Sequence, residues 1–448
     1  MLNFIKRIIP HDFFLRLWFH TLTAWIAALI YGFPAKKMIV IGVTGTDGKT
    51  TTCTLIHSIL KASGNKVGLA TTIRFSDGAK EWVNETHKTT LGRFHLQKFL
   101  SHMQKNGCTH LVLEVSSHAL AQGRITGIPI DIAVMTNLSH EHLDYHKTME
   151  HYRDTKLKLF KKLQSTRPLP GTHKVSICNF DDATAEDILK IPADVHSGYS
   201  LKTKNKDRNI ENTVKAEHIT HSKNGMSFDV LYHNSQTSFS IKLSGEYNVA
   251  NALAAFSVAK ALNISDKTIQ AGFDTVEKVP GRFELIQPTE CPFFIALDYA
   301  VTENAFTQLF HAARGLIGEN HRIIAIFGAC GDRDKEKRPK LGNIASQLCD
   351  ICIITDEEPY HENPEKIRNM ILEGVDRSKT ECHEIGDRRK AIREGLKLAQ
   401  AGDIVIVTGM GDQTSRIIGD EVMPWKEREV ILEELGEIRN QKSEGRSR

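Results

Sequence analysis

The chain has 448 residues, enough for about three domain-sized units that each bury a core. Its 40% hydrophobic and 25% charged residues exclude a largely disordered, collagenous or polytopic membrane protein. The net charge is +4, and residues 1–37 carry the same excess, because they hold five basic residues and one acid. The rest of the chain is therefore neutral, and we expect no nucleic-acid partner.

An apolar, aromatic stretch from Phe13 to Phe33 lies near the start of the chain. It has the length to span a bilayer, but Arg16 and His20 interrupt it and leave an uninterrupted part that is too short. No small-residue cleavage site follows, so we expect no secretory signal peptide. For residues 1–37 we favour a helix docked on the first domain over an interfacial helix in peripheral contact with a membrane, and both over a spanning helix.

Strand-like apolar runs then alternate with helical stretches, which predicts a parallel sheet with crossover helices. The predicted elements are strand 38–43, a helix from Thr50, strand 66–72, helix 94–105, and strands 111–115 and 130–137. Alternating polar and apolar residues at 226–232 and 237–243 predict an antiparallel patch, followed by a helix-rich stretch at 248–273. A second alternating series has strands 293–297, 322–327, 351–355 and 403–408. We place a domain boundary near residue 280 and expect the polar tail 437–448 to fray.

The eight cysteines do not form a disulfide framework, since Cys349 and Cys352 are the one close pair. Cys352 belongs to an apolar run that predicts a buried strand, and no second pair of cysteines or histidines completes a zinc site. We therefore interpret the pair as structural and expect a reducing, cytoplasmic setting.

The predicted strand 38–43 runs into Thr44-Gly-Thr-Asp-Gly-Lys-Thr-Thr51, a glycine loop at a helix start. Such a loop offers backbone N–H groups to phosphates, while Lys49 reaches the terminal phosphates and Thr50 can bind Mg²⁺. The strict P-loop spacing is not met, because five residues separate Gly42 from Gly48. The alternative is a simple glycine turn between a strand and a helix. We predict nucleotide binding, with ATP held by Gly45, Thr46, Asp47, Gly48, Lys49, Thr50 and Thr51.

This loop resembles the variant phosphate loop of the Mur ligase family. Further blocks resemble, in the same order, the members that extend a UDP-N-acetylmuramoyl dipeptide to a tripeptide. The blocks are residues 113–124, 136–146, 152–160, 245–252, 281–284, 298–300 and 331–335. The resemblance implies an α/β fold, with a P-loop central domain at 38–279 that holds a parallel sheet and an antiparallel patch, and a Rossmann-like C-terminal domain at 280–448.

The activity that the resemblance implies is ATP-dependent amide formation. The γ-phosphate passes to the acceptor's carboxylate, and an amino-acid amine attacks the resulting acyl phosphate, which yields an amide, ADP and phosphate. The clustered negative charge needs cations, which Lys49 and Mg²⁺ would supply. The catalytic residues implied are Lys49, His142 and Lys156.

The same resemblance implies the metal ligands. Thr50 and Glu114 would hold one Mg²⁺, and His142 a second. In similar ligases the lysine at the position of Lys156 is carbamylated, which converts a cation into a carboxylate-like ligand. Taken alone, His142 would be a hydrogen-bonded loop histidine and Lys156 a solvated helix residue.

Nucleotide contacts are implied on both sides of the boundary near residue 280. Asn248 and Asn251 resemble the adenine-binding asparagines of the family, with helix capping as the alternative. Arg282 and Asp298 resemble the C-terminal domain's contacts to phosphate and ribose. We therefore expect domain closure to assemble the site and exclude water from the acyl phosphate.

The acceptor site is only partly matched. Residues resembling the muramoyl-peptide contacts are present, although Leu91 stands where a proline is usual. The family has a separate UDP-binding domain before the phosphate loop, whereas 37 residues precede Met38 here. We expect an acceptor held mainly by its peptide end, or a related carboxylate. The contacts are Thr89, Thr90, Ser116, Gln122 and Arg124.

The loop that reads the incoming amino acid is residues 356–360, where enzymes using meso-diaminopimelate have Asp-Asn-Pro-Arg. Tyr360 replaces the arginine, and Glu357 and Glu358 add negative charge, so lysine or ornithine is favoured over diaminopimelate unless both acids are solvated. Val301 and the run 409–413 also depart from the pattern. Arg333 and Gln413 complete the expected substrate contacts.

The favoured function is a cytoplasmic ligase of peptidoglycan precursor synthesis that uses ATP, Mg²⁺, a muramoyl-peptide acceptor and an amino acid. One alternative is a ligase for another carboxylate, such as a folylpolyglutamate synthase relative. The other is an ATP-binding subunit of a larger assembly, with residues 1–37 as a docking or membrane element.

Overall fold

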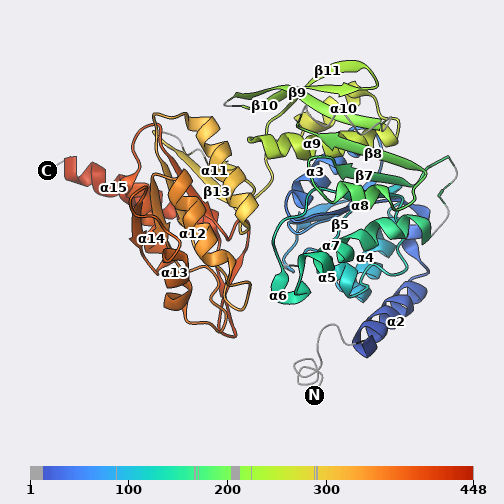
Figure 1. Ribbon diagram of the computed structural model, residues 1–448, viewed down its shortest axis with the longest axis horizontal. Helices are drawn as coiled ribbons and strands as arrows, with labels where there is room; N and C mark the ends of the chain where they lie inside the picture. Colours follow the sequence, from blue (N-terminus) through green and yellow to red (C-terminus); the bar gives the residue numbers. More distant parts are fainter. Residues whose placement is uncertain are drawn as a thin grey trace.

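The computed structural model describes residues 14–86, 88–165, 168–169, 171–202, 212–222, 224–286, 288 and 291–446. These residues form two bodies, drawn from blue to yellow and from yellow to red in Figure 1. We call the body around the larger sheet the first lobe and the body around the smaller sheet the second lobe.

The first lobe is built on eleven strands in the order β11-β10-β9-β8-β7-β6-β1-β5-β2-β3-β4. The central strands β2, β5, β1, β6, β7, β8 and β9 pair in parallel, and the antiparallel pairs lie at both edges. The bounds are β1 (Ile39–Thr44), β2 (Val67–Ala70), β3 (Arg74–Asp77), β4 (Glu81–Val83), β5 (His110–Glu114), β6 (Ile132–Met135), β7 (Val175–Asn179), β8 (Val195–Ser200), β9 (Asn212–Ser222), β10 (Gly225–Tyr232) and β11 (Ser235–Ile241). The predicted antiparallel patch thus continues the main sheet, and the edge β3–β4 was not predicted.

Helices cover both faces of this sheet. Ile41 and Val43 of β1 contact the core under α3, α9 and α10, whereas Val40 faces the core under α4, α5, α7 and α8, as the alternation of a strand requires. The bounds are α3 (Lys49–Ala62), α4 (Arg93–Lys105), α5 (Ser117–Ala121), α6 (Leu143–His146), α7 (Met149–Lys161), η2 (Lys162–Ser165), α8 (Ala185–Leu189), α9 (Glu246–Ala261) and α10 (Asp266–Asp274). Burial on both faces explains why the central strands read as unbroken apolar runs.

The second lobe has six strands in the order β12-β13-β17-β14-β15-β16, all parallel except β12. The strands are β12 (Glu284–Ile286), β13 (Phe294–Asp298), β14 (Ile323–Phe327), β15 (Ile351–Ile354), β16 (Glu381–Glu384) and β17 (Ile404–Thr408), with a hairpin of β18 (Ser415–Ile418) and β19 (Glu421–Pro424). The helices are α11 (Glu303–Ile317), α12 (Lys337–Leu348), α13 (Pro364–Leu372), α14 (Arg388–Leu398) and α15 (Glu427–Arg446). Cys349 and Cys352 are buried in the apolar core, so their structural interpretation is confirmed.

The C-terminal helix differs from the expected frayed tail. Helix α15 continues to Arg446, past the point where we expected fraying to begin. Arg393 of α14 pairs with both Glu434 and Glu437, and Ile438 is buried in the core. These contacts with α14 stabilise the helix in a stretch whose polar composition suggested disorder.

The N-terminal segment contains α2 (Phe14–Ile30) and η1 (Pro34–Lys37). Helix α2 lies against α4 (Figure 1). Its Ala24, Ala27 and Ala28 are buried. The docked interpretation is therefore confirmed for residues 14–37, and residues 1–13 lie outside the described residues. No helix among the described residues is long and apolar enough to cross a bilayer.

Candidate active site

The phosphate loop joins β1 to α3, with Gly45 and Gly48 at φ angles of 150° and 79°. A Cβ on Gly48 would lie 2.3 Å from Asn251 Oδ1, so the loop requires glycine there for space as well as for conformation. The residues after β6 hold the loop, since Asn137 accepts hydrogen bonds from the N–H groups of Thr46 (through its carbonyl) and Asp47 (through its side chain), both at 2.9 Å. These hydrogen bonds join the phosphate loop to the segment that follows β6.

Two lysines point into this loop. Lys49 Nζ donates to Thr46 O and Lys156 Nζ donates to Gly45 O, both at 2.6 Å. Lys156, on α7, is 1% exposed, so its interpretation as a solvated helix residue is wrong. Burial and the nearby charge of Lys49 lower the pKa of Lys156 well below its usual value. The loop therefore holds two amines where phosphate oxygens would enter.

Thr50 and Glu114, the two residues expected to hold the first metal ion, are in direct contact. Thr50 Oγ1 donates to Glu114 Oε2 at 3.0 Å, and both side chains are buried. Thr72 donates to the same carboxylate through its N–H at 2.8 Å and its hydroxyl at 2.9 Å, which fixes the carboxylate's orientation. A hydroxyl and a carboxylate at a phosphate loop are ligands that suit Mg²⁺. The pair fits one ion.

His142 occupies a left-handed position at φ 59° just before α6. Its ring packs edge-on against His118, with 4.8 Å between centroids. Desolvation, with positive charge from His118, Lys156 and Lys49, lowers the pKa of His142 well below its usual value. A neutral imidazole can coordinate a metal, but the amine of Lys156 offers no oxygen beside it. A second ion fits here only if Lys156 carries a carboxylate-like group.

The five expected acceptor contacts lie next to Glu114. Thr90 Oγ1 donates to Glu114 O at 3.0 Å, and the N–H of Ser116 donates to Thr90 Oγ1 at 3.2 Å. Arg124 donates to Gln122 Oε1 at 3.0 and 2.8 Å and to Thr90 O at 3.0 Å. Thr89 Oγ1 lies 3.1 Å from the hydroxyl oxygen of Thr72. Residues up to 35 positions apart therefore form one polar surface beside the phosphate loop.

The two asparagines of α9 face the loop rather than cap the helix. The N-cap is Gly245, which has no side chain to cap with, so the capping alternative is wrong. Asn251 Nδ2 donates to Asn248 Oδ1 at 3.0 Å, and Asn251 Oδ1 accepts from Thr52 Oγ1 at 3.2 Å. Asn248 Nδ2 donates to Ser244 O at 2.7 Å. Both amides lie beside the first turn of α3.

In the second lobe, Asp298 is buried and accepts backbone hydrogen bonds, whereas Arg282 packs on an aromatic ring. The Asp298 carboxylate is buried at the end of β13 and accepts the N–H groups of Phe283 at 2.6 Å and Ala300 at 2.5 Å. Burial raises its pKa to about 6. The Arg282 guanidinium lies over the Tyr299 ring, 4.4 Å from the centroid. Asp298 therefore fixes the turn that carries Arg282.

Glu357 and Glu358 are buried at 3% and 4% exposure, so their interpretation as solvated acids is wrong. Glu357 Oε1 accepts from the Cys330 thiol at 2.9 Å. Glu358 accepts from the N–H of Ile417 at 3.1 Å and lies 3.4 Å from the Tyr360 hydroxyl. Burial raises the pKa of Glu358, with the Glu357 carboxylate as the second cause. The two acids lie at the carboxyl ends of the parallel strands, where open α/β sheets bind ligands.

Arg333 and Gln413 line the same end of the sheet. The Arg333 guanidinium lies 5.3 Å from the centroid of the Tyr360 ring. Gln413 Oε1 is buried and has no hydrogen-bond partner among the described residues. A buried amide oxygen without a donor is energetically costly.

Contacts between the lobes were missed by the sequence analysis. Thr302 Oγ1 and Asn304 Nδ2, in the second lobe, both contact the Asp47 carboxylate at 3.2 Å. Lys337 Nζ lies 3.4 Å from Glu141. No local pattern marks Thr302 or Asn304, because each pairs with a residue more than 250 positions away.

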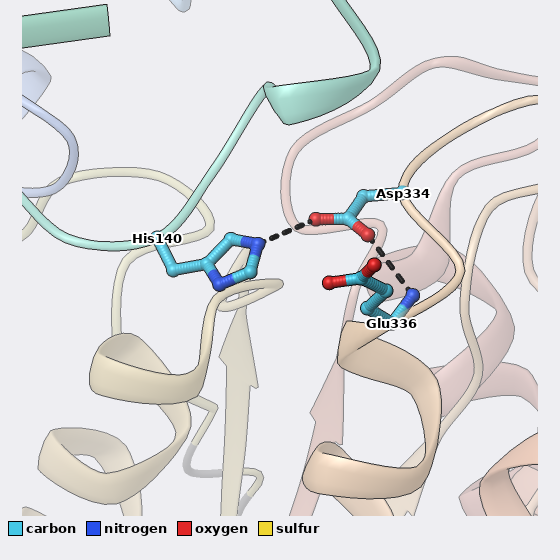
Figure 2. A group of neighbouring side chains, drawn as sticks. All are labelled: His140, Asp334 and Glu336. Carbon is cyan, nitrogen blue, oxygen red and sulfur yellow. Dashed lines mark hydrogen bonds and ion pairs between the residues drawn. The ribbon is translucent and has the colours of Figure 1, made fainter. Parts of the chain in front are cut away.

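Figure 2 shows a further contact between the lobes, with the ring of His140 directed at Asp334. His140 Nε2 lies 3.0 Å from Asp334 Oδ2, and Asp334 Oδ1 accepts the N–H of Glu336 at 3.0 Å. Ligand atoms of these three residues lie within 4.8 Å of one another. Because the His140 ring pairs directly with Asp334 and Glu336 is exposed, we interpret the group as a contact between the lobes rather than a metal site.

A phosphate loop in one α/β lobe, closed against the strand ends of another, defines a two-lobed ATP-binding protein. The family models agree, since residues 43–259 match the Mur ligase middle domain and residues 281–411 the Mur ligase glutamate ligase domain. The chain belongs to the Mur ligase family, whose members are ATP-dependent, ADP-forming amide ligases.

Curated relatives share more than a third of the aligned residues. The UDP-N-acetylmuramoyl-L-alanyl-D-glutamate–2,6-diaminopimelate ligase of Caldanaerobacter subterraneus subsp. tengcongensis is 38% identical over 92% of this chain and 81% of its own length. The UDP-N-acetylmuramyl-tripeptide synthetase of Roseiflexus sp. is 36% identical over the same shares.

Solved structures give the same fold. A UDP-N-acetylmuramoyl-L-alanyl-D-glutamate–2,6-diaminopimelate ligase matches with a TM-score of 0.59 at 31% identity, over 90% of this chain and 80% of its own. The folylpolyglutamate synthase of Mycobacterium tuberculosis complexed with ADP matches with a TM-score of 0.67 at 16% identity, over 86% of this chain and 91% of its own. At that identity the second match supports the fold alone.

Proposed function

We propose that this chain joins a diamino acid to a UDP-N-acetylmuramoyl dipeptide at the expense of ATP, a step of peptidoglycan precursor synthesis. One observation carries the proposal: the phosphate loop, the Thr50–Glu114 pair and the polar surface around Thr90 and Arg124 form one continuous site. The identity to ligases of that name supports the choice of acceptor.

The reaction needs two bond exchanges. The γ-phosphorus of ATP loses its bond to the β-phosphate oxygen and gains one to the acceptor's carboxylate, which leaves ADP. The amino-acid nitrogen then bonds to the acyl carbon, phosphate leaves with its oxygen, and the amine releases a proton. In this reaction Lys49 neutralises charge on the transferred phosphoryl group, and Arg124 and Thr90 orient the acceptor.

Thr50 and Glu114 would hold the first Mg²⁺, and His142 a second, together with carbamylated Lys156. The ion supplies positive charge at the phosphate oxygens. Burial favours the neutral amine of Lys156, which is the form that bonds to the carbon of CO₂ and releases a proton. If so, Lys156→Ala should lose phosphate release and regain part of it with added formate, whereas the exposed Lys158→Ala on the same helix should keep it.

The adenine and ribose would lie between the lobes. Asn248 and Asn251 would contact the base, with Arg282 and the Asp298 turn on the other side. We propose domains of residues 1–37, 38–279 and 280–448, because the two sheets fall on either side of residue 280. Closure of these domains would exclude water from the acyl phosphate.

For the amino acid we propose lysine or ornithine. Tyr360 stands where diaminopimelate enzymes have arginine, and Glu357 and Glu358 place negative charge at the same end of the second sheet. Gln413 Oε1 would accept from the amine of the amino acid, and Arg333 would pair with its carboxylate. A panel of amino acids tests this: turnover should be faster with lysine or ornithine than with meso-diaminopimelate, and the reverse order would overturn the proposal.

The function itself is tested by phosphate release from ATP with each substrate omitted in turn. Release that requires both a UDP-N-acetylmuramoyl dipeptide and an amino acid supports the proposal. Release with a folate and glutamate instead would favour the folylpolyglutamate synthase alternative, and release only after a partner protein is added would favour the subunit alternative. Because its substrates are soluble nucleotides and amino acids, we propose a cytoplasmic reaction.

A further inference from the structure

Helix α2 buries its small side chains and exposes its large ones. Ala24, Ala27 and Ala28 are covered by the first lobe, and a Cβ on Gly127 would come within 2.7 Å of Ala28 Cβ. On the other side seven large apolar side chains are exposed, and these we call the outer face of α2: Trp18, Phe19, Leu22, Trp25, Ile26, Leu29 and Ile30. A helix that packs only on its own domain turns its large apolar residues inward. Helix α2 instead leaves its large apolar side chains exposed.

The outer face is continuous along the helix. Its members recur every three or four positions, so they stack on one side over the length of α2. The exposed fraction is 63% at Trp18, 70% at Leu29 and 65% at Ile30, which shows that both ends of the helix take part. A contiguous apolar patch of this kind marks an interaction surface.

The sequence around this face lacks acids. No aspartate or glutamate occurs between Phe13 and Thr46, and Lys36 and Lys37, just after the helix, are exposed. Helix α4, on which α2 packs, lies in a second stretch without acids, residues 86–113, and exposes Lys98 and Lys105. Exposed cations therefore follow α2 in the chain and lie on the helix that α2 packs against, and neither stretch contains an acid to offset them.

We propose that the outer face of α2 binds the surface of an anionic lipid bilayer, with the helix in the plane of the interface. Tryptophan is favoured at that depth, and an apolar helix side bordered by lysines combines burial with attraction to acidic headgroups. Helix α2 has 17 residues, and no described helix can span a bilayer. A second copy of the chain is the less favoured occupant, because two such faces would bring their lysines together.

The test is flotation of the full-length protein with vesicles of phosphatidylcholine alone or mixed with phosphatidylglycerol. We expect binding to the mixed vesicles that weakens as salt is added. Leu29→Ser/Ile30→Ser should lower the vesicle affinity about tenfold or more, because it removes apolar side chains from the lipid contact. The matched control is Val422→Ser/Met423→Ser, which changes two exposed apolar residues on β19 of the second lobe and should bind like the wild type.

A second variant separates the contribution of positive charge to vesicle binding from that of apolar burial. Lys36→Gln/Lys37→Gln should reduce the preference for phosphatidylglycerol. Thermal melting and phosphate release in solution should stay unchanged in all three variants, since none of these residues belongs to the active site. Lack of vesicle binding by the wild type would overturn the proposal. So would a dimer, seen by sedimentation velocity, that Leu29→Ser/Ile30→Ser converts to a monomer.

Discussion

The hydroxyl of Thr302 donates to the carboxylate of Asp47 at 3.2 and 3.3 Å, and so joins the second lobe directly to the phosphate loop. The same hydroxyl accepts the N–H of Ala305 at 3.0 Å and caps α11. Asn304, in the first turn of that helix, donates to Asp47 at 3.2 Å. The start of α11 therefore contacts the phosphate loop directly, and we expect nucleotide binding to be coupled to closure of the lobes through these contacts.

Replacing Asn304 with alanine removes one of these contacts and leaves the cap intact. We expect the KM for ATP to rise about fivefold with little change in kcat, because loss of one hydrogen bond at the typical net value of about 1 kcal/mol would weaken closure by that factor. Steady-state phosphate release measures both constants. Asn343→Ala, on the exposed side of α12, is the control and should behave like the wild type. An unchanged KM in Asn304→Ala would show that this contact does not assist closure.

Lys49→Ala should abolish ATP hydrolysis, with a loss of at least about 100-fold in kcat, because the side chain provides positive charge where the phosphoryl group moves. A coupled enzymatic assay of ADP formation measures the rate of ATP hydrolysis. Lys61→Ala in the last turn of the same helix removes a lysine that pairs with Glu81 and should leave the rate intact. Turnover like the wild type in Lys49→Ala would contradict the nucleotide assignment of the loop.

Gly48→Ala should lower the affinity for ATP at least about tenfold. The added Cβ would lie 2.3 Å from Asn251 Oδ1, and φ is 79°, so the loop and the asparagine must both shift. Gly64 offers a matched control, since its φ is 82° and a Cβ there would meet nothing within 4 Å. Gly64→Ala should cost only about 1 kcal/mol of stability. If calorimetry gave Gly48→Ala the same ATP affinity as the wild type, the phosphate loop would not be in close contact with α9.

The buried His146 should make the protein less stable in acid. Desolvation lowers its pKa to about 3, whereas the unfolded chain binds the same proton near pH 6.5. The unfolded state therefore binds more protons between those values, and the free energy of unfolding falls as pH drops from about 6.5 toward 3. Urea unfolding between pH 7.5 and 4.5 should show a flatter slope in His146→Phe. The exposed His311→Phe should keep the wild-type slope, and parallel slopes in all three proteins would contradict the prediction.

Local patterns predicted much of the fold. The strand before the phosphate loop was expected at 38–43 and lies at Ile39–Thr44. In the second lobe no strand was expected at β12, β16, β18 or β19, whereas β13, β14, β15 and β17 fall within one residue of their expected positions. These strands are buried on both faces, so an apolar run is enough to mark them. The glycine loop with Lys49 and Thr50 could also be predicted from the sequence, because all its phosphate-binding residues lie within eight consecutive positions.

The burial of individual polar residues could not be predicted from the sequence. Lys156, Glu357 and Glu358 have sequence neighbours typical of solvated positions, yet all three are buried. The hydrogen-bond partner of Lys156 is Gly45, 111 positions away. Whether a charged group is buried depends on which distant segments pack over it in the folded chain. Local sequence patterns do not show which segments these are.

The sequence by itself determined the identity of the phosphate loop, the two series of alternating strands and helices, and the resemblance to the Mur ligases, because each depends on residues close together in the chain. The tertiary structure decided three other features: the burial of Lys156, the contact of Thr302 with Asp47, and the outward orientation of the apolar side of α2. These depend on which distant surfaces meet, and packing of the whole chain sets that outcome.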